Sequence, residues 1–244
     1  MNENEYIDRF NLLAQYQDED EYIEELVKLI RTIHYERTNF VKNSDNDNAR
    51  DEFFAFLKQE FIEVYNTYKE YSNSTNKIYK DIEFAGCGRT TVAIRIGDNV
   101  LKVGKSRTKD NIYEYQCLIP VYYSYDQEIT STEHYSIQLT PLVDTKNITD
   151  EDTYEAYRKL RKLGYIWNDP APKNVGRIIR TIEYLDNVFE EGEIVIIDLE
   201  DFCYVGEITP DEVIDELAYN SYNQKTYAFE MRYIEEQKNN TPHK

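Results

Sequence analysis

The most constraining feature of this sequence is the stretch from Gly164 to Asp201, where polar residues stand in a loop that cannot be helical and at the end of a β-branched run. Asp169 and Asn174 are five positions apart in a proline-rich loop, and proline removes an amide donor and keeps its preceding neighbour extended. The β-branched run 194–197 ends at Asp198 and predicts a buried strand. An acid, an amide and a second acid at the ends of buried elements can orient a hydroxyl nucleophile and hold Mg²⁺ on phosphates.

A second pattern lies upstream, in residues 82–103, where the apolar period changes to that of strands. Two apolar segments flank Gly86 and Gly88, a turn follows, and the next strand carries Lys102. Glycines let backbone amides approach a phosphate closely, and a lysine ammonium acts as a point charge on phosphate oxygens. The order strand, glycine loop, strand, turn, strand therefore indicates a nucleotide-covering sheet.

Together these patterns resemble the protein-kinase-like superfamily, whose catalytic loop reads H-R-D-x-x-x-x-N. Here Trp167-Asn168-Asp169 followed by Asn174 matches the family Asp and Asn, and Ile197-Asp198-Leu199-Glu200-Asp201 resembles the metal strand of the aminoglycoside phosphotransferase and choline kinase branches. The sequence departs from the family at Trp167, which replaces the loop His, at Glu200, which replaces the Gly of D-F-G, and at Thr91, which replaces the third loop glycine.

The resemblance implies ATP and Mg²⁺ as cofactors and a role for each matching residue. Asp169 and Lys102 are expected to be catalytic, and Asn174 and Asp198 to hold the metal. The nucleotide-binding set is expected to be Gly86, Gly88, Lys102 and Glu114, with Glu114 on a helix over Asp110–Leu118. Simpler alternatives remain open: an ordinary turn for the glycines, an edge-strand position for Lys102 and a solvated helical acid for Glu114.

The expected fold is α+β: a protein-kinase-like two-lobed fold with a reduced C-terminal lobe, preceded by a helical N-terminal extension. The boundaries are 1–77 for the extension, 78–142 for the sheet-containing lobe and 143–244 for the reduced lobe. Within 1–77, apolar residues recur at helical spacing, and the stripe over 53–68 is expected to pack against the next domain. Residues 135–142 are expected to form an inner strand running into a hinge, and the peptide-binding A-P-E region is not recognisable.

Two local patterns predict elements of the last segment. Thr149 with Asp152 three residues later is a capping-box pattern that opens a helix with Tyr154, Tyr157, Leu160 and Leu163 on one face, ended by Gly164. Residues 175–197 predict a hairpin with an acidic tip. One helix is also expected to start near Pro210, and a second helix is expected to carry Tyr227, Met231 and Ile234.

Composition narrows the function classes. The formal net charge is −19, which disfavours sequence-independent nucleic-acid binding, and no apolar run reaches membrane-spanning length. Three cysteines without metal-ligand spacing fit a cytoplasmic setting. No membrane or nucleic-acid partner is expected.

Three functions remain to be weighed. The first is a phosphotransferase that uses ATP and Mg²⁺, with a protein or small-molecule hydroxyl as acceptor. The second is a pseudokinase that binds a partner without catalysis, motivated by Thr91, Trp167, Glu200 and the missing peptide region. The third is an acidic interaction protein with a basic protein partner, motivated by charge alone.

Overall fold

The computed structural model describes residues 3–16, 18–37, 47–71, 82–88, 90–106, 115–130, 133–199, 202–206 and 224–240. The fold is mixed α+β, and the strands that pair in the described sheets are antiparallel. The chain divides into two compact units, one formed by Met1–Arg107 and Pro120–Leu142 and the other by Thr108–Ile119 and Val143–Lys244. Each unit is described by itself below.

A five-stranded sheet forms the centre of the first unit. Its strands are β1 (Ile82–Cys87), β2 (Thr91–Ile96), β3 (Asn99–Ser106), β4 (Tyr123–Thr130) and β5 (Glu133–Pro141), in the order β1-β2-β3-β5-β4. Successive side chains of a strand point to opposite faces, and every second residue of β2, from Val92 to Ile96, is fully buried. The expected strand–loop–strand pattern and the inner strand at 135–141 are confirmed.

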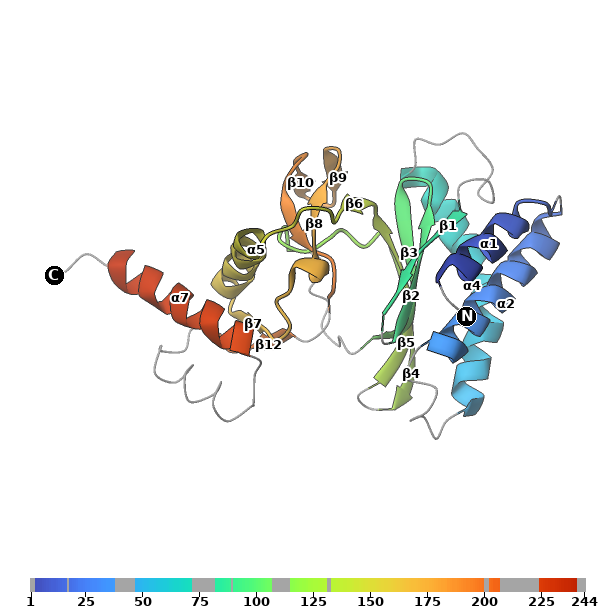
Figure 1. Cartoon of the computed structure of the whole chain (residues 1–244), viewed down its shortest axis with the longest axis horizontal. Helices are drawn as coiled ribbons and strands as arrows, with labels where there is room; N and C mark the ends of the chain where they lie inside the picture. The colour runs from blue at the N-terminus through green and yellow to red at the C-terminus, as the bar shows by residue number, and fades with distance from the viewer. Residues whose placement is uncertain are drawn as a thin grey trace. The chain divides into compact units, whose positions relative to one another are not determined.

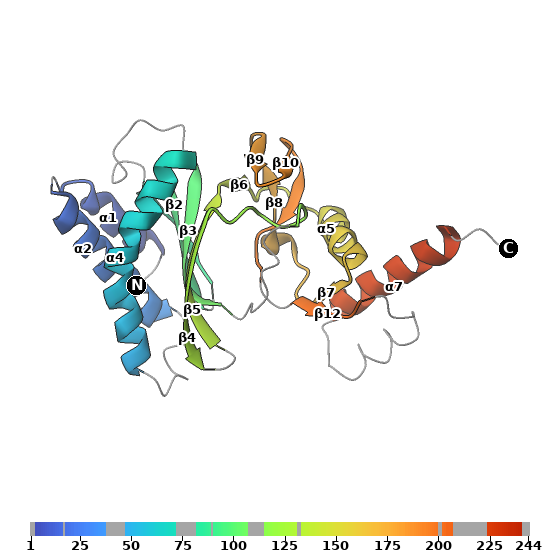
Figure 2. The ribbon, with the colours of Figure 1, turned by 180° about the vertical axis from the view of Figure 1, so that it is seen from behind.

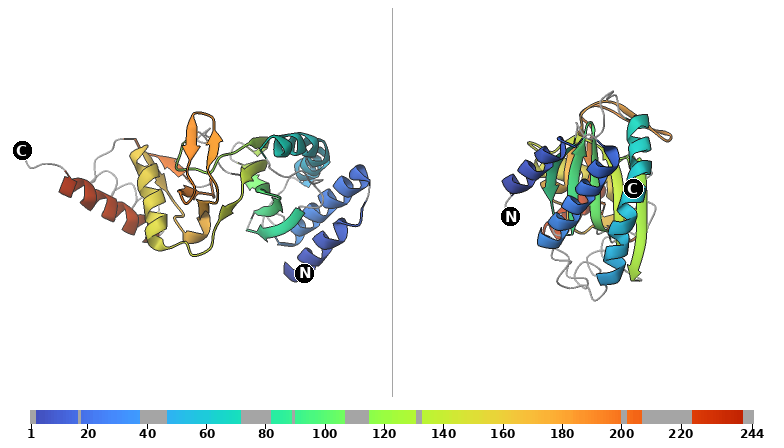
Figure 3. Two further views of the ribbon diagram at one scale, coloured as in Figure 1. Left: turned by 90° about the horizontal axis from the view of Figure 1, so that it is seen from above. Right: turned by 90° about the vertical axis from the view of Figure 1, so that its right-hand side faces the viewer.

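Three helices cover one face of this sheet, as Figure 1 and the right-hand view of Figure 3 show: α1 (Glu3–Leu13), α2 (Glu19–Arg37) and α4 (Asp47–Tyr71). Their apolar stripes and the strands form one hydrophobic core, in which the Phe53 ring stacks on Tyr135 of β5 with centroids 4.9 Å apart. The stripe over 53–68 therefore packs against the sheet as expected. Because helices and sheet share this core, the position 77/78 does not separate two cores, and the extension and the sheet form one unit.

The described residues of the second unit form short strands and two helices. Figure 2 shows the helices α5 (Asp150–Lys162) and α7 (Gln224–Asn240) beside each other. The strands form a three-stranded sheet and two two-stranded sheets. They are β6 (Val143–Asp144), β7 (Tyr165–Trp167), β8 (Val175–Ile178), β9 (Ile182–Tyr184), β10 (Asn187–Phe189), β11 (Ile194–Ile196) and β12 (Phe202–Tyr204), with the 3₁₀ turn η2 (Pro172–Asn174) before β8. The predicted hairpin over 175–197 is confirmed, since β8 pairs with β11. The chain between these two strands forms the β9–β10 hairpin.

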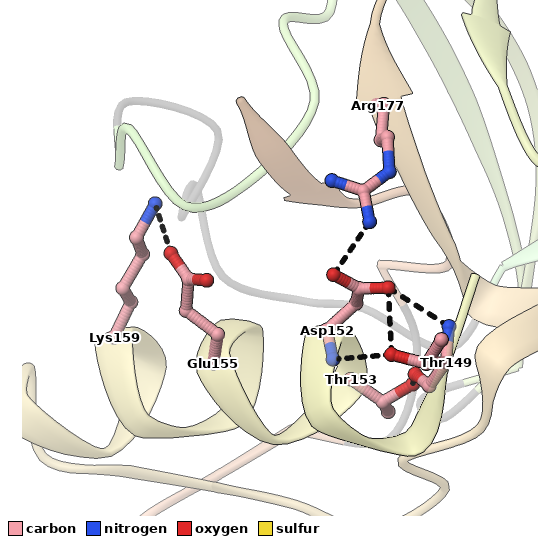
Figure 4. Close-up of polar contacts among 6 residues, drawn as sticks. All are labelled: Thr149, Asp152, Thr153, Glu155, Lys159 and Arg177. Carbon is pink, nitrogen blue, oxygen red and sulfur yellow. Dashed lines mark hydrogen bonds and ion pairs between the residues drawn. The ribbon is translucent and has the colours of Figure 1, made fainter. Parts of the chain in front are cut away.

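The start of α5 has the predicted capping box (Figure 4). The Thr149 hydroxyl accepts the backbone N–H of Asp152 at 3.1 Å, and the Asp152 carboxylate accepts the backbone N–H of Thr149 at 2.9 Å. Tyr154, Tyr157 and Leu160 are buried as expected. Leu163 was wrongly placed on the buried face: it is the C-cap residue and is 40% exposed, because the chain leaves the helix there and turns at Gly164, whose φ is +88°.

Helix α7 forms near the predicted place but buries a different face. Ile234 is buried as expected, whereas Tyr227 is 45% exposed and the inward face carries Thr226, Phe229 and Glu230 instead. The prediction failed because hydropathy alone does not place a glutamate in a core. The helix expected near Pro210 lies outside the described residues.

None of the helices in the described ranges has the length and apolar character needed to cross a bilayer.

Candidate active site

The loop that carries Asp169 is fixed at both ends by strands. Before it, β7 pairs with β12, and Trp167 lies opposite Phe202 with the two rings edge to face at 6.3 Å. After it, η2 leads directly into β8, which pairs with β11. Trp167 is almost fully buried, so its indole anchors the loop by packing.

Asn174 holds Asp169 through two hydrogen bonds. Its Nδ2 donates to the backbone carbonyl of Asp169 at 3.0 Å and to the carboxylate Oδ2 of Asp169 at 3.2 Å. Both partners are acceptors, so the amide must present its nitrogen to them and direct its acceptor oxygen Oδ1 elsewhere. Asn174 is buried, whereas the Asp169 side chain is about half exposed, at 50%. The acid is therefore oriented by a buried amide and remains accessible.

The backbone of Asn174 also reaches the segment that carries Asp198. The Ile197 N–H donates to the Asn174 carbonyl at 2.9 Å, one residue before Asp198. Strand β11 itself ends at Ile196, slightly earlier than the predicted end at Asp198. The side chain of Asp198 is partly buried and has its own interactions. Thus the fold joins the Asp169–Asn174 loop to the start of the Asp198 segment by direct backbone contact, as the sequence predicts.

Lys102 and the two glycines lie in the first unit. Lys102 is in the middle of β3, opposite Ala93 of β2 on one side and Gln138 of β5 on the other. The alternative of an edge-strand lysine is therefore wrong. Its neighbours Leu101 and Val103 are fully buried in the core shared with the helices, so Lys102 projects from the opposite face of the sheet.

The glycine segment forms the tight end of the β1–β2 hairpin. The register shifts between Phe84 and Gly86, whose φ is +146°, and the Gly88 N–H closes the turn on the Thr91 carbonyl at 2.8 Å. A methyl group built on Gly86 would meet nothing within 4 Å. The backbone of this hairpin is therefore open at Gly86 to a close approach from outside.

Sequence reasoning missed a third glycine, Gly104 of β3. A Cβ there would lie against the Thr90 carbonyl oxygen and 2.7 Å from the Cα of Thr91. The glycine hairpin thus packs directly on β3, and only glycine permits that distance. The available signal was a glycine inside a predicted strand, directly after Val103.

Glu114 lies outside the described residues, and so does most of the helix expected over 110–118. The part that is described, from Tyr115, is a turn followed by Leu118, which forms a parallel bridge with Ile196. This end of the segment is not helical, because it pairs with β11 instead. The expected Lys102–Glu114 pair stays a prediction.

The chemistry of the described side chains excludes some alternatives. Burial raises the pKa of the Cys117 thiol to about 12, so this cysteine is not an activated nucleophile. Among the described residues no group of three His, Cys, Asp or Glu side chains could enclose a metal ion. A magnesium ion on a nucleotide takes only one or two protein carboxylates and completes its shell with phosphates and water. Asn174 Oδ1 and the Asp198 carboxylate are oxygen donors of the kind that such an ion takes from a protein.

A comparison with protein-family models and with curated protein sequences finds no match to this chain.

Proposed function

We propose that this protein is an ATP- and Mg²⁺-dependent phosphotransferase of kinase-like, two-lobed architecture, which transfers a γ-phosphoryl group to a hydroxyl of a protein or small molecule. The observation that carries the proposal is the double hydrogen bond from Asn174 to Asp169, with the Asn174 carbonyl bonded to the N–H of Ile197. This arrangement links an oriented carboxylate to two oxygen-bearing side chains, Asn174 and Asp198, at the base of the β8–β11 hairpin. Phosphoryl transfer depends mainly on such positioning and on charge stabilisation.

Each residue has a defined role in the proposal. Asn174 fixes one oxygen of Asp169, so the other oxygen can accept the proton of the acceptor hydroxyl. Asn174 Oδ1 and Asp198 would hold Mg²⁺, which supplies charge neutralisation on the phosphates when bound. Lys102 would bind phosphate oxygens, and the backbone at Gly86 and Gly88 would cover them.

In its described residues the second unit consists of short strands and the helices α5 and α7, which supports the proposal of a reduced lobe. The three cysteines are free thiols, which fits the proposed cytoplasmic location.

Mg-ATP binding and turnover by the full chain test the proposal. We expect calorimetry to detect Mg-ATP binding to the wild type, and radiolabelled ATP to show Mg²⁺-dependent turnover with water, the protein itself or an added alcohol as acceptor. Asp198→Asn should abolish Mg²⁺-dependent turnover, and Lys102→Met should lower it on the order of 100-fold. The matched controls are Asp186→Asn in the exposed β9–β10 turn and Lys162→Met at the exposed end of α5.

The outcomes separate the candidate functions. Turnover that is lost in Asp198→Asn and kept in Asp186→Asn supports the phosphotransferase. Mg-ATP binding without any turnover identifies a nucleotide-binding pseudokinase. Absence of Mg-ATP binding by the wild type contradicts the phosphotransferase and the nucleotide-binding pseudokinase and leaves a protein that binds a partner without nucleotide. Unchanged turnover in Asp198→Asn removes that residue from the mechanism.

A further inference from the structure

One threonine of the last described helix contacts the backbone just before Asp169. Thr226, in the first turn of α7, is fully buried. Its Oγ1 lies 3.3 Å from the carbonyl oxygen of Trp167 and 3.0 Å from that of Asn168. A hydroxyl donates one proton, which these two carbonyls share, and both lie on the chain that leads into the loop.

The contact fixes the peptide unit next to Asp169. The Asn168 carbonyl and the Asp169 N–H belong to one planar group. Holding the carbonyl oxygen therefore sets the orientation of that plane and limits the direction in which the Asp169 side chain leaves the backbone. Asn174 restrains Asp169 from the other side, because it donates to the backbone carbonyl and to the carboxylate of Asp169. Thr226 and Asn174 thus restrain the two peptide units that flank the Asp169 Cα.

Helix α7 is itself fixed, so Thr226 is a rigid point. Glu230 lies four residues after Thr226, on the same face of the helix, and is fully buried. Its carboxylate accepts Arg161 Nε at 3.0 Å and the Tyr157 hydroxyl at 2.6 Å, both from α5. At the surface Arg232 forms a bidentate pair with Glu151, at 2.7 Å for each bond.

We propose that Thr226 is a positioning residue for Asp169, acting through the Asn168 carbonyl, so that α7 belongs to the catalytic machinery of this protein. This inference rests on the proposed function. A loop that is misplaced by about 1 Å loses on the order of 100-fold in rate. We expect the loss of this hydroxyl to affect the transition state for phosphoryl transfer, because the proposal gives Thr226 no part in nucleotide binding.

The test compares variants with and without the hydroxyl in the full chain. Thr226→Val keeps the shape of the side chain and removes the hydroxyl. Thr226→Ala removes both the hydroxyl and the methyl group, and Thr226→Ser keeps the hydroxyl. The control is Thr153→Val, which removes another buried hydroxyl of this unit, bonded to the Thr149 carbonyl at 2.9 Å in the first turn of α5 (Figure 4). We expect kcat to fall at least 10-fold in the two hydroxyl-free variants, KM for Mg-ATP to stay within twofold, and Thr226→Ser to recover most of the rate.

Hydrogen exchange of residues 168–174 gives a second readout that needs no activity. We expect exchange there to be several-fold faster in Thr226→Val and Thr226→Ala than in the wild type, Thr226→Ser or Thr153→Val. If the wild type turns over no ATP, the proposed function fails and the exchange rates alone decide whether Thr226 holds the loop. Equal kcat in Thr226→Val and Thr226→Ser, or equal loop exchange in the two, overturns the inference.

Discussion

Glu230 is the residue whose burial is least expected in this chain, because a carboxylate is rarely placed in a core unless it is paired. Here it is fully buried against Arg161 and the Tyr157 hydroxyl. Burial, and then the neighbouring Glu230 charge, raise the pKa of Tyr157, so the phenol stays a neutral donor at all ordinary pH values. The group is a satisfied polar cluster between α5 and α7, and its members depend on one another.

Removing Glu230 should therefore be costly. Glu230→Ala leaves the Arg161 charge buried without its partner, and we expect the free energy of unfolding to fall by roughly 3–5 kcal/mol. Denaturant unfolding of the full chain measures this loss of free energy, and hydrogen exchange of residues 150–163 measures the effect on the α5 segment. Glu235→Ala on the exposed side of α7 should change stability by less than about 0.5 kcal/mol. Similar small losses for both variants would show that the buried cluster does not hold α7 on α5.

Helix α5 is stabilised at its first turn by one acid that serves several donors. The Asp152 carboxylate accepts the backbone N–H and the hydroxyl of Thr149 and pairs with Arg177 of β8 at 2.6 Å (Figure 4). The backbone hydrogen bond from Thr149 is the main reason that the pKa of Asp152 lies below its usual 3.8, with further contributions from the Thr149 hydroxyl and Arg177. The charged form is thus favoured by folding.

This pKa shift predicts a pH-dependent stability. Because the folded pKa is lowered, the contribution of Asp152 is fully present above the unfolded value near 4 and is lost as the pH falls through the lower folded value. Asp152→Asn, which resembles the protonated acid, should be about 1 kcal/mol less stable than the wild type at pH 7, and the difference should be smaller at pH 3. Urea unfolding at both pH values measures it. A difference of equal size at the two pH values contradicts the assignment, and Asp186→Asn in the exposed turn should show none.

Elements with strong local signals could be predicted from the sequence, and those that depend on distant partners could not. The alternation Val92, Ile94, Ile96 and the Thr149–Asp152 box each describe an interaction between near neighbours, and both form as expected. The prediction that Tyr227 faces inward was wrong, because α7 buries the face that carries Glu230. Burial of that face depends on the ion pair of Glu230 with Arg161, which is 69 positions away.

The candidate site shows the same division. The proline-rich loop gave Asp169 and Asn174, and the β-branched run gave the segment of Asp198, because each signal is local. Thr226 was not found, since a threonine in a helix has no pattern that points to the carbonyl of Asn168, and Gly104 was found only through its contact with the hairpin at Thr90. Residues that support a site from another element carry little sequence signal.

The hydrophobic core of the first unit is shared by the N-terminal helices and the five-stranded sheet. The apolar stripe of α4 contributes several of its largest side chains, and Phe53 stacks on Tyr135 with an angle of 15° between the rings. The sheet thus buries one face under the helices and presents Lys102 on the other. The N-terminal helices are therefore required for the fold of the unit that would bind the nucleotide.

Two phenylalanines of α4 test this requirement, because one faces the sheet and the other does not. Phe53 is fully buried and Phe56 is 41% exposed. Phe53→Ala removes a stacked core ring and should lower the free energy of unfolding by about 3–5 kcal/mol, with faster hydrogen exchange in β3 and β5 of the same unit. Phe56→Ala should cost less than about 1 kcal/mol. If Phe53→Ala leaves exchange in these strands unchanged, the helices do not support the sheet, and residues 1–71 would be an appendage after all.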